Sequence, residues 1–361
     1  MTRDVLALNA GSSTLKVSLY RFEAERETEL FAETVQVADG KAAELLDQLL
    51  QRLTAASGRL PDAVSHRLVH GGDRFSTPVR VDDTVLEQLA SLVELAPLHL
   101  PPALSLLKEA RQRLPHVSHI ACFDTAFHGT LPDVARRLAL PQQLSERGIR
   151  RYGFHGLSCE YALSVLGKPP PARLVVAHLG SGASLTAIRD GQSVDTSMGL
   201  TPSGGIPMGT RPGDLDPGVL LHLLRTRQYS EAELQQLINH ESGLMGIAGS
   251  SNMQLLLTRA SQGDARADAA VATFAYGIKK QLGAYIAALG GLDCLVFTGG
   301  IGEHAPSIRQ RALAGLEALG IELDATLNEQ NAAVISLSTS QVLVRIVSAN
   351  ENLVLARAAR S

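Results

Sequence analysis

The stretch Leu174–Ile188, LVVAHLGSGASLTAI, contains two apolar runs separated by a glycine-rich turn. The first run ends near His178, and Gly180-Ser181-Gly182 forms the turn. This pattern predicts a buried strand, a bend and a partner strand. Glycines at such a bend let backbone N–H groups approach a ligand closely, and anions are the favoured ligands. The alternative is a hairpin whose glycines only turn the chain.

A stretch near the N-terminus repeats this pattern. Val5–Leu19, VLALNAGSSTLKVSL, aligns with it without a gap, so that Asn9 falls on His178. A third strand-and-glycine unit, Cys294–Glu303 (CLVFTGGIGE), runs into a helical pattern. The repeat predicts two related halves, each opening with a hairpin, that form a phosphate-binding clamp across a cleft.

The composition limits the class of protein. A chain of 361 residues is long enough for about two domains. A hydrophobic content of 45% fits a folded α/β protein rather than a disordered one. The net charge is −3 without a block of basic residues, which argues against nucleic acid or an anionic membrane as a partner. No apolar run approaches the roughly 20 residues that span a bilayer, and the N-terminus has no signal-peptide pattern.

The cysteines indicate the compartment. Cys122, Cys159 and Cys294 are scattered and odd in number. This usage is typical of a reducing environment and predicts no disulfide framework. We therefore expect a cytoplasmic protein.

Hydrophobic periodicity and turn residues predict alternating strands and helices. The predicted strands are the hairpin Asp4–Tyr20, then Thr28–Val37, Ala63–Val69, Val117–Phe123 and Val342–Ser348. The predicted helices are Lys41–Leu53, Thr84–Leu95, Ala103–Leu114, a helix from Ser158, Asp264–Leu289 and Pro306–Leu319. Asp216 and Pro217 predict one helix start, and Ser230 with Glu233 predicts a capping box. The segment Asp195–Pro217 has little regular pattern, and a loop of this length is usually functional or mobile.

Common nucleotide and metal motifs are missing from the sequence. It has no GxxxxGK[ST] P-loop, no HExxH and no CxxC, and Gly300-Ile301-Gly302 does not complete a dinucleotide fingerprint. Instead, polar residues stand in turns at strand ends, with Asp124 and Glu351 each placed at the end of a strand. Each also has a structural alternative, as a sheet-edge arginine, a core histidine or a helix cap. The residues in question are Asn9, Arg67, Asp124, His155, His178, Arg211 and Glu351.

These residues lie in motifs that resemble those of the acetate kinases (acetate/propionate kinase family), nearly end to end. The matching segments are Asn9–Lys16 (NAGSSTLK), His66–Gly72 (HRLVHGG), Phe123–His128 (FDTAFH), Arg151–Gly156 (RYGFHG), Asp195–Gly199 (DTSMG) and Met208–Arg211 (MGTR). The resemblance implies an α/β fold with two ribonuclease-H-like domains, a duplicated actin-like ATPase fold with an interdomain active-site cleft. It places the N-terminal domain at 1–128 plus 352–361 and the nucleotide-binding domain at 129–351.

The resemblance further implies reversible phosphoryl transfer from ATP to acetate, giving ADP and acetyl phosphate by direct in-line transfer. Arg67, Arg211 and His155 match the phosphoryl-stabilising and substrate-orienting residues. Asp124 matches the residue often described as the proton acceptor. Because acetate is already ionised at pH 7, we expect Asp124 to orient Arg67 or a metal-bound water instead.

Binding residues follow from the same resemblance. Asn9 and Glu351 match a Mg²⁺ site, which Mn²⁺ could share. The acyl pocket matches Arg67, Val69, Leu98, Phe154 and Pro202, and Val69 is bulkier than the alanine that accompanies propionate use. The nucleotide-binding positions are Lys16, His178, Leu179, Gly180, Ser181, Gly182, Asn252, Met253, Gln254, Gly300, Ile301, Gly302, Glu303 and His304.

Several positions depart from the family pattern. Ser181 replaces an asparagine, Asn252 and Gln254 replace charged residues near the adenosine, and His304 replaces an asparagine. Leu100 and Cys159 also replace an asparagine and a histidine, respectively. Most of these changes fall on the nucleotide side. They predict an altered or loose nucleotide preference rather than a different reaction.

Other functions remain as alternatives to an acetate-specific homodimeric enzyme. They are a propionate or other short-chain acyl kinase, and a variant that uses pyrophosphate or another nucleotide. A non-catalytic nucleotide switch of the same fold has no need for Arg67, His155 and Arg211 together. A sugar kinase of the same fold needs a polar pocket, whereas the positions matched to the pocket are apolar.

Overall fold

The computed structural model describes residues 2–11, 14–24, 26–36 and 42–360. The chain divides into two compact units, Met1–Gly129 with Asn350–Ser361, and Thr130–Ala349. It therefore leaves the first unit after Gly129 and returns to it with the segment that contains Glu351. Ser12, Ser13, Val37 and Lys41, which belong to predicted elements or motifs, lie outside the described residues.

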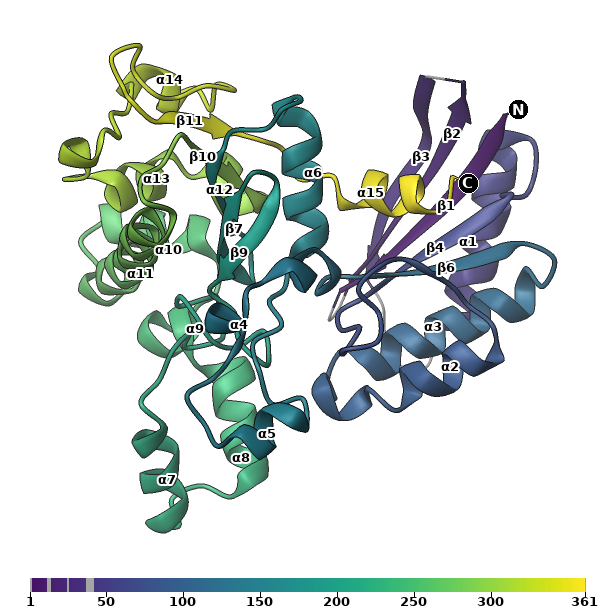
Figure 1. The fold of residues 1–361 in the computed structure, drawn as a ribbon, viewed down its shortest axis with the longest axis horizontal. Coiled ribbons are helices and arrows are strands. Elements are labelled where there is room, and N and C mark those ends of the chain that lie inside the picture. The colour runs from purple at the N-terminus through teal and green to yellow at the C-terminus, as the bar shows by residue number, and fades with distance from the viewer. Residues whose placement is uncertain (1, 12–13, 25, 37–41, 361) are drawn as a thin grey trace. The chain divides into compact units, whose positions relative to one another are not determined.

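The first unit is built on a six-stranded mixed sheet (Figure 1). Three antiparallel strands come first in the chain, and two further strands then run parallel to β1. In spatial order the strands are β3 (Arg26–Gln36), β2 (Thr14–Glu23), β1 (Arg3–Ala10), β4 (Ala63–Leu68), β6 (Ser118–Phe123) and the short β5 (Val79–Arg80).

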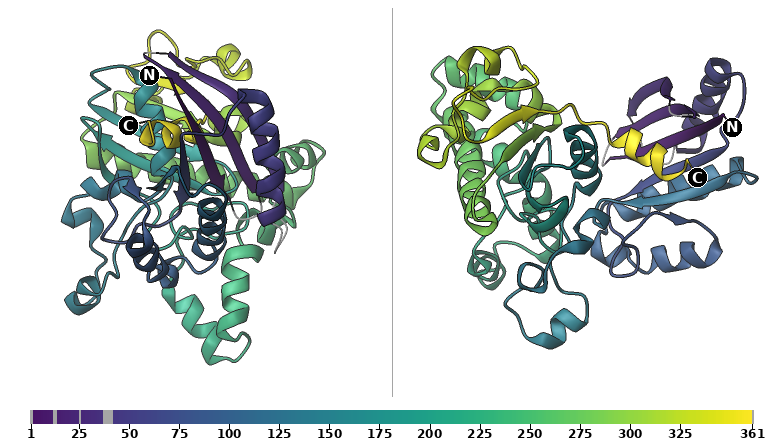
Figure 2. Two further views of the ribbon diagram at one scale, coloured as in Figure 1. Left: turned by 90° about the vertical axis from the view of Figure 1, so that its right-hand side faces the viewer. Right: turned by 45° about the horizontal axis from the view of Figure 1, so that its top comes forward.

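Helices cover both faces of this sheet. On one face Leu6 and Leu8 of β1 join a core with α1 (Ala42–Ser57) and α3 (Leu100–Arg113). On the other face Val5 joins a cluster with α15 (Glu351–Ala358), which Figure 2 shows in yellow against β1. The period-two alternation of the strand residues thus supplies two separate apolar layers. The remaining elements of the unit are α2 (Asp83–Ala90), η1 (Val93–Leu95) and η2 (Ala126–Thr130).

The second unit repeats this arrangement with a five-stranded sheet. Its strands β7 and β8 form the hairpin predicted for Leu174–Ile188, and β10 and β11 run parallel to β7. In spatial order the strands are β11 (Leu343–Ile346), β10 (Cys294–Thr298), β7 (Arg173–Leu179), β8 (Ala183–Arg189) and β9 (Gln192–Thr196). When β7 is matched to β1, the order β9-β8-β7-β10-β11 corresponds to β3-β2-β1-β4-β6 of the first sheet. This correspondence confirms the predicted duplication.

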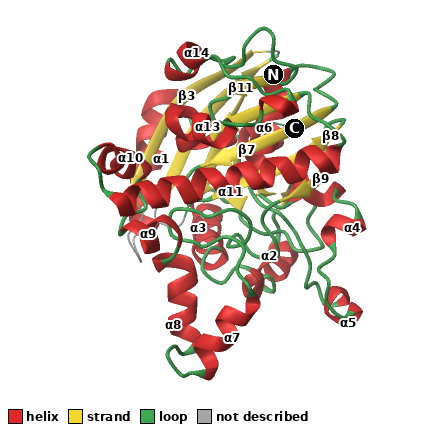
Figure 3. Ribbon diagram, turned by 90° about the vertical axis from the view of Figure 1, so that its left-hand side faces the viewer, coloured by secondary structure: helices red, strands yellow, loops and turns green. Residues whose placement is uncertain are grey.

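One long helix supports the second sheet. α11 (Ala265–Leu289) crosses β7 and β8 (Figure 3), and α6 (Gly156–Leu166) also packs against β7. As predicted, Asp264 caps the start of α11, and its carboxylate accepts hydrogen bonds from two backbone N–H groups. The helix ends at Gly290, which has a left-handed backbone conformation. The helices α9 (Gly243–Ala248), α10 (Met253–Ser261) and α13 (Pro306–Leu313) pack on α11.

Several predicted bounds were wrong. α3 begins at Leu100 rather than at 103, because Pro101 and Pro102 fit in its first turn, where no N–H bond is lost. α13 ends at Leu313, where Gly315 adopts a positive φ, and the rest of the predicted helix is η4 (Glu317–Leu319). The remaining short helices are α4 (Asp133–Arg136), α5 (Gln142–Glu146), α7 (Pro217–Arg225), α8 (Glu231–Gln236), η3 (Leu237–Glu241), α12 (Gly299–His304) and α14 (Ala325–Glu329).

Two helix starts follow the sequence as predicted. Asp216 caps α7 with Pro217 in its first turn, and Ser230 and Glu233 form a complete capping box on α8. Across the described ranges, none of the helices combines the length and the apolarity that crossing a bilayer requires.

Candidate active site

Arg67 and Asp124 form a buried ion pair at the carboxyl ends of β4 and β6. Leu68 pairs with Phe123 in register, and the Asp124 N–H donates to the Leu68 carbonyl, so the carboxylate follows directly beside β4. The Nε of Arg67 donates to both oxygens of Asp124 at 3.0 and 3.1 Å, and its Nη2 donates at 2.5 Å. Its Nη1 donates to the Ala10 carbonyl at 2.9 Å. The guanidinium is therefore fixed on two sides.

Burial and neighbouring charges both shift the pKa values of this ion pair. Burial alone would lower the pKa of Arg67, but the carboxylates of Asp124 and Glu351 outweigh it, so this pKa lies above its ordinary value. Burial raises the pKa of Asp124, the Glu351 carboxylate adds to this effect, and contact with Arg67 opposes it. Arg67 is thus a permanent cation that Asp124 holds in place.

Asn9, Lys16 and Glu351 also lie together in the first unit. Asn9 and Lys16 are register partners across the β1–β2 hairpin, so their side chains share one face of the sheet. The Asn9 Nδ2 donates to Glu351 Oε2 at 2.9 Å. Glu351 was wrongly predicted to end a strand. It is the first residue of α15, because the Asn350 side chain accepts from the Leu353 N–H and starts a helix there.

In the second unit, His155 stands at the start of α6 in a left-handed backbone conformation, with φ +60° and ψ +26°. Such angles are uncommon for a non-glycine residue and persist where surrounding contacts enforce them. The preceding segment is fixed to the end of β9 and to the chain that follows it. Arg151 Nη1 donates to the Thr196 carbonyl at 2.6 Å, and the Tyr152 N–H donates to the Gly199 carbonyl at 3.0 Å.

The rings of His155 and His178 stack, with centroids 4.2 Å apart and planes 22° from parallel. The Nδ1 of His155 is 2.9 Å from the Ser184 hydroxyl, and the Nδ1 of His178 is 2.8 Å from the Ser158 hydroxyl. α6 and the β7–β8 hairpin therefore position both rings.

The glycine turn lies directly against these side chains. A Cβ at Gly182 would stand 3.0 Å from Arg211 Nη2 and 3.3 Å from His155 Nε2. A Cβ at Gly180 would stand 3.6 Å from His178 Nε2. The Gly180 N–H donates to the Gly182 carbonyl at 3.0 Å, which closes the turn. Gly182 is therefore required for the close approach of a cation and an imidazole.

Arg211 is a half-buried cation, and among the described residues no acidic side chain lies within ion-pair distance of it. Its Nη1 donates to the Pro202 carbonyl. Burial lowers the pKa of Arg211, and no carboxylate opposes this effect. A cation kept partly out of water without a counter-charge is a setting in which an anionic ligand is stabilised.

Comparison with known proteins identifies the family. The model of the acetokinase family matches residues 33–357. The chain belongs to the acetokinase family. The acetate kinase of Methylocella silvestris is 42% identical over 99% of this chain and 97% of its own length. Among solved structures, the acetate kinase of Porphyromonas gingivalis has a TM-score of 0.87 at 35% identity and covers 98% of each chain.

A propionate kinase from Francisella tularensis has a TM-score of 0.89 at 33% identity, over 99% of this chain and 98% of its own. These relatives show that the chain is a phosphotransferase with two domains of the actin-like ATPase fold, as the resemblance implied.

The positions matched to the nucleoside fall on two separate segments of the second unit, 252–254 and 300–304. Asn252 caps α10, so its Oδ1 is already committed to the Leu255 N–H, while Met253 is buried and Gln254 is exposed. Gly300, Ile301, Gly302, Glu303 and His304 follow β10 closely. With Gly299 they form the short helix α12, because Gly299 turns the chain sharply at φ +77°.

Arg309 supports this helix and was missed by sequence reasoning. It is completely buried, and its Nη1 donates to the carbonyls of Gly302 at 2.8 Å and Glu303 at 3.1 Å. Its Nε and Nη2 bond to the side chain and carbonyl of Asn328. Burial lowers the pKa of Arg309 to about 10, which leaves it charged at neutral pH.

The apolar positions matched to the acyl pocket are divided between the units. Val69 follows β4 and is buried, and Leu98 is 43% exposed. In the second unit, Phe154 is buried beside His155, and Pro202 holds Arg211 through its carbonyl. Each unit therefore combines at least one apolar side chain with an arginine.

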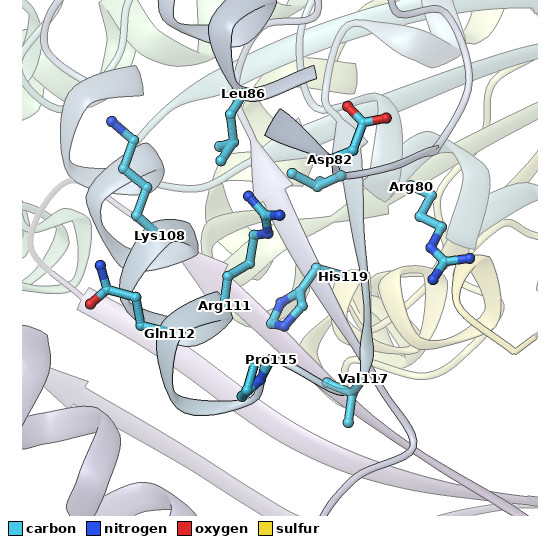
Figure 4. Close-up of a pocket in the computed structure, with 10 residues that line it drawn as sticks. Arg80, Asp82, Leu86, Lys108, Arg111, Gln112, Pro115, Val117 and His119 are labelled. Atoms are coloured by element: carbon cyan, nitrogen blue, oxygen red, sulfur yellow. The ribbon is translucent and has the colours of Figure 1, made fainter. Parts of the chain in front are cut away.

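A cavity of about 770 Å³ in the first unit contains none of the predicted site residues. It lies at the start of β6, whereas Asp124 follows the end of that strand. Figure 4 shows Arg111 near its centre, with Arg80 and Lys108 directed away from one another. His119 lines it, and its Nδ1 is 3.0 Å from Nε2 of the buried His66.

Both imidazoles of this pair have perturbed protonation. Burial lowers the pKa of His66 well below its ordinary value, and the nearby His119 adds to this. Burial and the charge of Arg111 lower the pKa of His119, although a hydrogen bond to the Leu114 carbonyl opposes them. The pair is therefore a neutral, buried feature of the first sheet rather than part of the predicted site.

The structure brings the predicted residues together in two clusters, one in each unit. The first contains Asn9, Lys16, Arg67, Asp124 and Glu351. The second contains His155, His178, Gly180, Gly182 and Arg211. Sequence reasoning missed Ser158, Ser184 and Arg309, because isolated serines and an arginine within a helical pattern carry no motif signal.

Proposed function

We propose that this protein transfers the γ-phosphoryl group of ATP reversibly to acetate, giving acetyl phosphate and ADP. Both reactants are negative, and the transferred group spreads its charge over its equatorial oxygens in the transition state. Fixed cations and N–H donors are therefore more useful than a base. The observation that carries the proposal is Arg211, a half-buried cation without an acidic partner in the described chain, beside His155 and the glycine turn.

In this proposal Arg67 orients the acetate carboxylate and neutralises charge during transfer. Three of its five N–H groups are engaged, by Asp124 through Nε and Nη2 and by the Ala10 carbonyl through Nη1. One N–H on each terminal nitrogen remains for a ligand. Because acetate is ionised at pH 7, Asp124 acts on Arg67 rather than as a base.

The donor set around Asn9 and Glu351 fits Mg²⁺, and Mn²⁺ takes the same oxygen ligands. Both are oxygen-bearing side chains, a carboxylate and an amide, and the Asn9 Nδ2–Glu351 Oε2 hydrogen bond holds them side by side. Mg²⁺ typically binds one or two protein oxygens together with substrate phosphates and water. When bound, the ion would neutralise phosphate charge.

For the nucleotide, we propose that Lys16 and the turn His178–Gly182 contact phosphates, while Asn252–Gln254 and Gly300–His304 lie along the nucleoside. Neither Asn252 nor Gln254 offers a charge, and the Asn252 Oδ1 already accepts from the Leu255 N–H. A modest preference for ATP over GTP follows. Initial rates with ATP, GTP and pyrophosphate test this, and an exclusive ATP requirement would contradict it.

We also propose a cytoplasmic homodimer. The three cysteines are buried and none forms a disulfide, which suits a reducing compartment. α7 and the residue before its cap expose apolar side chains that a second copy could cover, namely Leu215, Val219, Leu221 and Leu224. Light scattering of the Leu221→Glu variant should report a shift toward monomer, and cell fractionation tests the location.

The direct test of the reaction is trapping of the acyl phosphate. ATP, acetate, Mg²⁺ and hydroxylamine should give acetyl hydroxamate at a rate proportional to enzyme concentration. Propionate should react more slowly, because one methylene in an apolar pocket changes kcat/KM by roughly 10–200-fold. Absence of hydroxamate from any short carboxylate, with the protein folded, would reject the proposal.

A further inference from the structure

Two hydrogen bonds run in opposite directions between α6 and the β7–β8 hairpin. His155, at the start of α6, bonds through Nδ1 to Ser184 on β8. His178, on β7, bonds through Nδ1 to Ser158 on α6. His178 and Ser184 are also direct register partners in the hairpin. Each element thus contributes one ring and holds the other through a serine.

The two hydroxyls define which ring nitrogen carries the proton. Ser158 and Ser184 are each 1% exposed, and within the described residues the histidine is the only hydrogen-bond partner of each hydroxyl. If Nδ1 carried a proton, the hydroxyl would accept it and its own O–H would be buried without an acceptor, which is strongly unfavourable. The hydroxyl therefore donates, and Nδ1 accepts.

A neutral imidazole that accepts at Nδ1 carries its proton on Nε2. The Nε2 atoms are on the side of the glycine turn, 3.3 Å from a Cβ position at Gly182 for His155 and 3.6 Å from one at Gly180 for His178. Nearby charge favours the neutral rings, since Arg211 reaches within 3.0 Å of the same Gly182 position and the two rings stack on each other.

We propose that Ser158 and Ser184 are positioning residues that hold His178 and His155 as neutral rings whose Nε2–H groups point toward the phosphoryl group at the glycine turn. The identity of that ligand rests on the proposed function, whereas the tautomer rests on the hydrogen bonds alone. The arrangement supplies two N–H donors without adding positive charge beside Arg211. Arg211 then supplies the positive charge, and the two rings supply hydrogen bonds of fixed orientation.

Nitrogen NMR of the full chain, labelled with ¹⁵N-histidine, measures the tautomers directly at pH 7. Spectra of His155→Gln and His178→Gln assign the two rings. We expect both to show an unprotonated Nδ1 and a protonated Nε2. An imidazolium, a proton on Nδ1 or signals averaged between tautomers in either ring would overturn the proposal.

Serine variants test the positioning role. In Ser184→Ala we expect the His155 signals to average between tautomers and kcat to fall about 10-fold, the loss of one hydrogen bond, with the KM for ATP little changed. Ser184→Thr should restore both. The matched control is Thr186→Val on the same strand, whose hydroxyl bonds instead to Thr196 at 3.2 Å.

Unchanged signals and kcat in Ser184→Ala, or an equal loss in Thr186→Val, would overturn the positioning role. If the alanine variant fails to fold, Ser184→Cys replaces it in the test, because cysteine is close to serine in volume but its S–H is a weak hydrogen-bond donor. If the wild type gives no acyl phosphate, the proposed function fails, and the NMR spectra still decide the tautomers.

Discussion

The guanidinium of Arg67 and the carboxylate of Asp124 are joined by three hydrogen bonds although 57 residues separate them in the sequence. Arg211 is in the opposite situation, because no described acidic side chain pairs with it. The two arginines should therefore respond differently to removal. The first is part of the fold of its unit, and the second is available to a ligand.

Arg67→Ala should lower both activity and stability. It leaves the Asp124 carboxyl buried without its cation, and breaking such a pair destabilises a fold by about 3–5 kcal/mol. Turnover should fall by roughly 10³-fold or more. Urea unfolding and hydroxamate formation measure the two effects. Removing both partners should recover part of the stability but no activity, and a stable Arg67→Ala protein would contradict this account.

Arg211→Ala should lower activity alone. The substitution removes a half-buried charge and one hydrogen bond to the Pro202 carbonyl, with no carboxylate left unpaired. We expect turnover to fall by roughly 10³-fold or more, with the thermal midpoint near that of the wild type. Calorimetry and initial rates check this, and near-normal turnover in the folded variant would remove Arg211 from the site.

Gly182→Ala should affect the site through sterics. Its Cβ would stand 3.0 Å from Arg211 Nη2 and 3.3 Å from His155 Nε2, so both groups must move. A displacement of this size should reduce kcat by about 10²-fold. Gly283→Ala is the matched control, since its Cβ meets nothing within 4 Å in α11. Equal activity of the two variants would show that the close approach is not needed.

The free energy of unfolding should decrease as the pH falls below about 6.5. His66 and His119 have lowered pKa values in the fold, so the unfolded chain binds more protons in this range. The contribution of the two neutral rings to the free energy of unfolding is fully present above the ordinary histidine pKa. It is lost as the pH falls toward their lowered pKa values in the fold, by up to about 1.4 kcal/mol per pH unit for each ring. Urea unfolding from pH 7.5 to 5.5 should show a smaller slope in His66→Phe.

His116→Gln serves as the control for this slope, because His116 is exposed. A stability that stays constant down to pH 5.5 in the wild type, or a His66→Phe slope equal to that of the wild type, would mean that the pair is not neutral in the fold.

Val69→Ala should broaden acyl specificity. Val69 is buried directly after the strand that carries Arg67, and a smaller side chain there leaves room for an added methylene. The ratio of kcat/KM for acetate over propionate should fall by several-fold, within the 10–200-fold that a methylene is worth. Rates with acetate, propionate and butyrate measure it. A wild type that prefers butyrate would exclude Val69 from the pocket.

The fold was largely predictable because its signals are local. The gap-free repeat of Val5–Leu19 in Leu174–Ile188 corresponds to β1–β2 and β7–β8, which open two sheets of the same strand order. Capping residues such as Asp264 and Ser230 set helix starts through bonds within a few residues of the chain. Such bonds depend little on the rest of the protein.

The residues that gather in the two clusters stand in recognisable motifs, but their local structure was harder to predict. Glu351 starts a helix because of the Asn350 cap, and the glycines after β10 enter α12 because a positive φ at Gly299 turns the chain. Ser184 acts on a histidine 29 residues away. Contacts at that separation arise from packing, which periodicity does not describe.

α15 closes the apolar face of the first sheet and supplies Glu351, but the ribosome makes it after the whole second unit, Thr130–Ala349. At about 5–20 residues per second, translation of that unit occupies on the order of ten to forty seconds. During this interval the strands around Val5 and Tyr20 are without their covering helix. The nascent first unit thus exposes an apolar sheet face during this interval, and the oxygens proposed to bind the metal are complete only at the end of synthesis.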